Sequence, residues 1–123
     1  MLNRDQILNR QAGRFETVTV PEWGGDVRLK ALCVRDKAVI DTEMMRVGKL
    51  MRTQDLDAVS ANHNLQLTLV ALSVVDESGE ALFTLDDVPE LSKLEPQAIR
   101  DLSDAVCILN GFATKAVEDA AKN

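Results

Sequence analysis

Hydrophobic and polar residues alternate in two short runs near the start of the chain. The first run, residues 15–20 (FETVTV), is rich in β-branched side chains, and the second, residues 26–34 (DVRLKALCV), begins with apolar side chains at every other position. Between them lies PEWGG, in which Gly24 and Gly25 can supply the positive φ of a tight turn. The pattern predicts a β-hairpin over about residues 15–34.

Apolar residues next recur at the helical period over about residues 36–53. The apolar stripe consists of Ile40, Met44, Val47 and Met51, widened by Val39, Met45 and Leu50. Asp36 is the residue type that caps a helix N-terminus. We therefore expect a helix that begins at Asp36 and presents this stripe to the rest of the protein.

Further helices are expected over about residues 55–75, 86–94 and 96–110, with a flexible or helical tail at 112–123. Leu and Ala content favours a helix in the first of these segments, although residues 65–75 also alternate and leave a strand as the alternative. The sequence TLDD has the form of a capping box before the second, and a proline opens the third. In the third segment the apolar residues recur at the helical period: Ile99, Leu102, Val106 and Leu109. The glycine of the DESGE segment is expected in a turn.

The chain has 123 residues, which suits one domain covering residues 1–123. The predicted fold class is α+β, mainly α, with an N-terminal β-hairpin followed by a small helical domain. The net charge is −6 and aromatic residues make up only 3%, which argues against nucleic acid as a ligand. The apolar stretch at 65–75 is too short for a membrane span and no leader is evident, so a soluble cytoplasmic protein is expected.

Residues suited to catalysis or metal binding are few and scattered. His63 is the sole histidine and has no Cys, Asp or Glu three or four positions away, so a solvent-facing position is expected. Cys33 and Cys107 sit between apolar neighbours and are expected to be small buried residues. The acidic pairs are Asp55/Asp57, Asp76/Glu77 and Asp86/Asp87. Capping and solvated turns account for the last two pairs, and we expect no enzyme, no metal and no cofactor.

Four residues are candidates for contact with a partner: Trp23, Met44, Met45 and Met51. Helical spacing favours a core position for the methionines, and a turn tryptophan often packs beneath its sheet. However, methionine is also the adaptable side chain of hydrophobic binding surfaces. A stripe this wide exceeds what one hairpin covers, so its surplus would pack against a helix of a partner or of a second copy.

Two segments resemble the tail assembly chaperones of long-tailed (siphovirus-type) bacteriophages and prophages. TVTVPEWGGDVRLKAL, residues 17–32, resembles that family's hairpin, and VVDESGEALFTLDDVPEL, residues 74–91, resembles its segment after the long helices. Their order and spacing and the chain length also fit. The family's pattern residues are structural here, so the resemblance implies no ligand-binding residue.

The resemblance implies a chaperone of virion morphogenesis. Such a protein binds the tape measure protein, keeps it soluble and helps recruit major tail tube subunits, and self-association is a further expectation. It would act in the host cytoplasm and be absent from the mature virion. A longer form made by a −1 frameshift would engage the tube protein, and Ala121-Lys122-Asn123 is compatible with a slippery codon run. The alternatives are a tail completion or tube-end protein of the virion and a small bacterial interaction adaptor.

Overall fold

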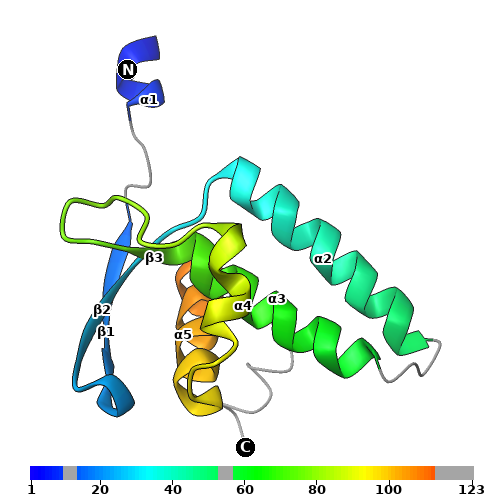
Figure 1. The fold of residues 1–123 in the computed structure, drawn as a ribbon. Coiled ribbons are helices and arrows are strands. Elements are labelled where there is room, and N and C mark those ends of the chain that lie inside the picture. The colour runs from blue at the N-terminus through cyan, green and yellow to red at the C-terminus, as the bar shows by residue number, and fades with distance from the viewer. Residues whose placement is uncertain (10–13, 53–56, 113–123) are drawn as a thin grey trace, which may run out of the picture.

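The computed structural model describes residues 1–9, 14–52 and 57–112, and Figure 1 shows their arrangement. The elements in chain order are α1 (Arg4–Leu8), β1 (Phe15–Val20), η1 (Pro21–Trp23), β2 (Gly25–Lys30), α2 (Val34–Arg52), α3 (Asp57–Ser73), β3 (Val74–Val75), η2 (Leu85–Asp87), α4 (Val88–Leu91) and α5 (Pro96–Leu109). The predicted fold class, α+β and mainly α with an N-terminal hairpin, is confirmed. Most of the predicted tail, residues 113–123, lies outside the described residues.

The β-hairpin forms where alternation predicts it. β1 pairs antiparallel with β2, and the register runs from Phe15 opposite Lys30 to Val20 opposite Gly25. The turn is the short η1 helix followed by Gly24, whose φ is +67°. Gly25 lies within β2 and has no positive φ, so the prediction that both glycines supply one is wrong.

Residues 65–75 resolve into both of the structures that the sequence left open. α3 continues to Ser73, and the next two residues form β3, which places Val74 opposite Leu29 and Val75 opposite Arg28. Both valines are buried. The sheet therefore has the order β1-β2-β3, and only the last two residues of this segment form the strand that was left as the alternative.

α2 begins two residues before the position that the sequence suggested. Asp36 is its third residue rather than the N-cap, and its Oδ2 accepts a hydrogen bond of 3.4 Å from the backbone N–H of Cys33. The carboxylate thus satisfies an exposed donor at the helix start from within the first turn. The ammonium group of Lys30 lies 3.7 Å from the same carboxylate oxygen.

The second half of the chain follows the predicted start signals, with one shorter helix. Thr84 and Asp87 form the expected capping box, but it opens the single-turn η2, which leads into the short α4 instead of a helix over 86–94. Pro96 occupies the first turn of α5 as expected. Gly79 and Gly111 have φ values of +87° and +71°, as a turn and a helix end require.

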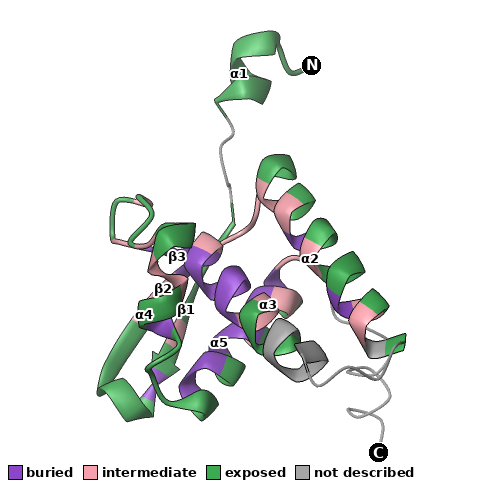
Figure 2. Ribbon diagram, turned by 45° about the vertical axis from the view of Figure 1, so that its right-hand side comes forward, coloured by how far each residue is buried: buried purple, intermediate pink, exposed green. Residues whose placement is uncertain are grey.

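The core lies between the sheet, α3 and α5. Figure 2 shows buried residues along the inner sides of these elements, whereas the side of α2 that faces away from α3 is exposed. The predicted stripe of α5 is buried throughout: Ile99, Leu102, Val106 and Leu109. α2 packs chiefly against α3 and stands at one side of the domain (Figure 1).

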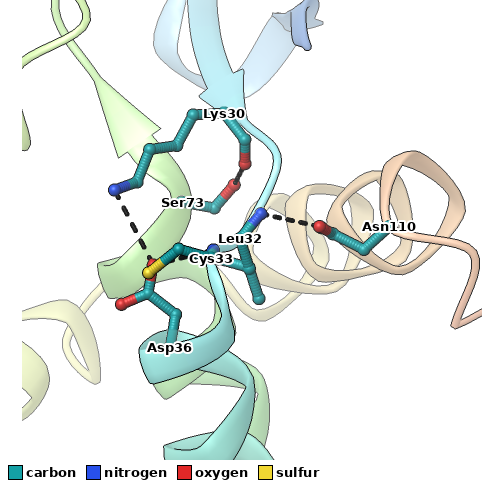
Figure 3. A network of polar contacts seen from close by, with 6 residues as sticks. All are labelled: Lys30, Leu32, Cys33, Asp36, Ser73 and Asn110. Atoms are coloured by element: carbon teal, nitrogen blue, oxygen red, sulfur yellow. Dashed lines mark hydrogen bonds and ion pairs between the residues drawn. The ribbon is translucent and has the colours of Figure 1, made fainter. Parts of the chain in front are cut away.

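Hydrogen bonds between distant segments hold the link between β2 and α2 in place (Figure 3). Ser73, at the end of α3, donates from its hydroxyl to the carbonyl of Lys30 at 2.7 Å. The backbone N–H of Leu32 donates to Oδ1 of Asn110 at 2.7 Å, which ties the link before α2 to the end of α5. The start of α2 is therefore held in place by contacts that involve β2, α3 and α5.

Candidate partner-binding surface

α2 has one buried side and one exposed side over its second half. Ile40 and Val47, which are 2% and 6% exposed, lie on the side that packs against α3. Met44 and Met45 point away from that side, with exposed fractions of 50% and 75%. Two large apolar side chains thus remain in contact with solvent on consecutive positions of one helix.

The core position favoured for the methionines is therefore wrong for Met44 and Met45. Ile40 and Val47 lie about 20° apart around the helix, and Met44 lies about 40° from Ile40 on the side away from Val47, at the edge of the side that α3 covers. Met45 lies a further 100° around. The side chain of Met51 lies outside the described residues, so its predicted role remains a prediction.

An open hollow lies on this exposed part of α2. The residues that line it, which we call the methionine face, are Met44, Met45, Arg46, Gly48, Lys49 and Arg52. Gly48 lies near its middle, and a Cβ placed on this glycine would meet no atom within 4 Å. The methionine face therefore combines apolar side chains, a gap in the helix surface and basic groups.

The charges of the methionine face are all positive. Arg46 forms an ion pair of 2.8 Å with Glu43 on the same helix. Arg52 donates from Nε to the carbonyl of Gly48 at 3.4 Å, and no ion pair joins Lys49 or Arg52 to another described residue. No acidic residue occurs between positions 44 and 52 in a chain whose net charge is −6. The face is a local basic region on an acidic protein.

Trp23 lies elsewhere, at the hairpin turn. It is 37% exposed, and its indole Nε1 donates to Oε2 of Glu95 at 2.8 Å. This hydrogen bond, together with one from the backbone of Glu95 itself, lowers the pKa of Glu95. Trp23 therefore joins the hairpin turn to the start of α5, and the structure does not bring it together with Met44 and Met45.

The candidate chemical groups do not converge. His63 is exposed, as predicted, and lines a hollow of about 260 Å³ between α3, α4 and α5. Cys33 is exposed rather than buried, because it precedes the first turn of α2 at the surface, and Cys107 is half-buried. Burial, followed by the nearby charge of Asp104, raises the pKa of the Cys107 thiol. The described part of the chain holds no cluster of His, Cys, Asp or Glu suited to a metal ion.

The acidic pairs that are described have structural roles. Oδ1 of Asp76 accepts hydrogen bonds from the backbone N–H groups of Ser78 and Glu80, which closes the turn after β3. Asp87 accepts from the backbone N–H of Thr84 in the capping box. Asp55 and the side chain of Asp57 lie outside the described residues. Among the helices described, none is both long enough and apolar enough to cross a membrane.

Sequence reasoning missed the polar half of the methionine face. Gly48, Lys49 and Arg52 were not among the predicted partner-binding residues, although the run from 44 to 52 holds three basic residues and no acidic one. That local charge bias, set against an acidic chain, was the available signal. Helical spacing then places Met44, Gly48 and Arg52 one turn apart on the same side.

The fold is similar to that of a solved bacteriophage protein. The structure of the bacteriophage HK97 tail assembly chaperone matches this chain with a TM-score of 0.58 and 21% sequence identity, covering 85% of this chain and 97% of that one. No protein-family model matches the chain. No curated protein matches it either. The fold that the sequence resemblance implied is thus confirmed.

Proposed function

We propose that this chain is a tail assembly chaperone of a long-tailed bacteriophage or prophage. It binds the tape measure protein, keeps it soluble and helps to recruit major tail tube subunits during tail morphogenesis. The observation that carries the proposal is the fold shared with the HK97 tail assembly chaperone over 85% of this chain. The sequence motifs of residues 17–32 and 74–91 support the same family independently of the fold.

The surface of the protein is suited to holding a helical client in solution. Met44 and Met45 offer flexible, polarisable side chains that adapt to varied apolar ridges. The net charge of −6 keeps the chaperone itself away from the neutral charge at which proteins associate and precipitate. A site of this kind needs shape adaptation and charge rather than a catalytic group.

The proposed site of action is the host cytoplasm, before the tail is complete. An assembly chaperone leaves the tail before the virion is complete, so the chain is expected to be absent from the mature virion. The proposed route to the tube protein is a longer, frameshifted form of the same chain.

The composition of purified particles tests this function. In a phage or prophage that encodes the chain, deletion of its gene is expected to leave heads without complete tails. Mass spectrometry of wild-type particles is expected to detect tape measure and tube peptides but none from this chain. Detection of the chain in amounts comparable to other tail proteins would instead make it a structural component of the virion.

A further inference from the structure

We propose that the methionine face of α2 binds one amphipathic helix of a partner protein, and that the apolar ridge of this helix is bordered by carboxylates. The inference rests on the proposed function, because it specifies the kind of segment that a client presents. Three features of the methionine face support it: the exposed apolar side chains, the gap at Gly48 and the basic groups of Lys49 and Arg52.

The exposed residues of α2 form a continuous track along the helix. At 100° per residue, Met44, Gly48 and Arg52 lie in one row, and Met45 and Lys49 form a second row beside it. Within each row, successive residues are about one turn apart. Two neighbouring rows of this kind form the ridges and the groove against which another helix packs. Because the opposite side of α2 packs against α3, these rows have no helix of their own domain over them among the described residues.

Gly48 marks the point of closest approach. Glycine is unfavourable inside a helix, and nothing within the described domain requires one here, since a Cβ would enter open space. A helix surface without a side chain at this point allows a second backbone, or a large apolar side chain, to sit between the two rows. Gly48 is one of the residues that line the hollow on the methionine face, which agrees with the absence of a side chain at this position.

The basic side chains of the methionine face favour a partner helix that carries carboxylates. Lys49 and Arg52 stand exposed beside the methionines with no acidic group of the described residues paired to them, whereas Arg46 is already paired with Glu43. A helix with Glu or Asp on either side of an apolar ridge would pair with these groups while its ridge covers Met44 and Met45. A basic helix would place like charges together, which disfavours it.

A synthetic peptide measures this preference directly. The probe is a labelled 20-residue helix with leucines at the helical period and glutamates flanking them, titrated with the full-length chain by fluorescence anisotropy. A control peptide keeps the leucines and replaces every flanking glutamate with lysine. The acidic peptide is expected to bind at least about tenfold more tightly than the basic one, with the difference shrinking as salt is raised.

Two variants of the apolar part test where the peptide sits. The double variant Met44→Gln/Met45→Gln and the single variant Gly48→Leu are each expected to weaken acidic-peptide binding about tenfold. All three positions face solvent or open space, so circular dichroism should show unchanged melting or a slight rise. The matched control is Ile108→Gln, which removes an equally exposed apolar side chain from α5 and should leave binding unchanged.

Charge reversal gives the sharpest outcome. The variant Lys49→Glu/Arg52→Glu is expected to reverse the preference, so that the basic peptide binds more tightly than the acidic one. The control Lys93→Glu/Arg100→Glu makes the same change in net charge, in the link after α4 and on α5, and should keep the original preference. Equal affinity for both peptides, or an unchanged preference in the Lys49→Glu/Arg52→Glu variant, would overturn the proposal.

A second copy of this chain is the competing occupant of the methionine face. Sedimentation of the chain alone would reveal it, since Met44→Gln/Met45→Gln would then dissociate an oligomer. That result would overturn the proposal of a partner helix. The peptide measurement contains no tape measure protein, so its failure leaves the proposed function standing, whereas the particle composition tests that function by itself.

Discussion

The hydroxyl of Ser73 donates a hydrogen bond of 2.7 Å to the backbone carbonyl of Lys30, which joins the last turn of α3 to the end of β2. Ser73 is fully buried, and the valine that follows it enters the sheet as the third strand. This contact therefore fixes the helix-to-strand junction beside the base of α2. The contact therefore helps to fix the position of the hairpin relative to α2, the helix that carries the methionine face.

Removing this hydroxyl should destabilise the whole domain. Ser73→Ala leaves the Lys30 carbonyl without its buried donor, and we expect the free energy of unfolding to fall by about 1–2 kcal/mol. Urea denaturation followed by circular dichroism measures this change. The exposed Ser78→Ala variant is the control and should stay within about 0.5 kcal/mol of wild type. Equal stabilities for the two variants would show that the junction does not depend on this bond.

Two glycines are expected to respond to alanine with opposite signs. Gly48→Ala introduces a better helix former into open space and should raise the free energy of unfolding by about 0.5–1 kcal/mol. Gly79→Ala places a side chain at φ +87° and near the Phe15 ring, and should lower it by about 1–2 kcal/mol. Thermal melting of both variants is the measurement. A loss of stability in Gly48→Ala would mean that the glycine serves α2 itself.

The pKa of Glu95 should depend on Trp23. The indole hydrogen bond lowers this pKa, so Trp23→Phe is expected to return it toward the ordinary value for glutamate. Carboxyl-carbon NMR during a pH titration measures it, and Phe15→Leu, which leaves the indole in place, is the control. Because the folded-state pKa is lowered, the stabilisation by this bond is present above the ordinary glutamate range. It is lost as the pH falls through the lowered value.

The two cysteines should react with alkylating reagents at different rates. At pH 8 we expect iodoacetamide to modify the exposed Cys33 faster than Cys107, whose thiol is half-buried and has a raised pKa. Mass spectrometry over time gives both rates, and the rate at Cys107 should climb as the pH is raised. Asp104→Asn should speed modification of Cys107 and leave Cys33 unaffected. A faster Cys107 in the wild type would contradict its burial in solution.

The sequence predicted those elements that have a clear apolar periodicity and recognisable residues at their ends. α5 has a strong apolar stripe bounded by Pro96 and Gly111, and the stripe is buried as expected. β3 could not be predicted in this way, because two residues have no periodicity. They form a strand only because β2 supplies a partner. The start of α2 was misplaced because Asp36 caps from the third helical position, a role that composition alone does not separate from an N-cap.

The candidate surface was predicted only in part. The stripe in α2 identified Met44 and Met45, but periodicity does not tell how many sides of a helix its neighbours cover. α3 covers Ile40 and Val47 and leaves the methionines exposed, which only the packing shows. Trp23 was grouped with them by residue type, although its partner is Glu95, 72 positions away in sequence.

Co-expression with the tape measure protein of a phage or prophage that encodes this chain is the most direct test of the proposed function. The quantity to measure is the fraction of tape measure protein that stays soluble and co-purifies with the affinity-tagged chain. We expect most of the tape measure protein to be insoluble alone and to become soluble, in a stable complex, when the chain is present. Tape measure protein that remains insoluble beside abundant, folded chain would contradict the proposed function.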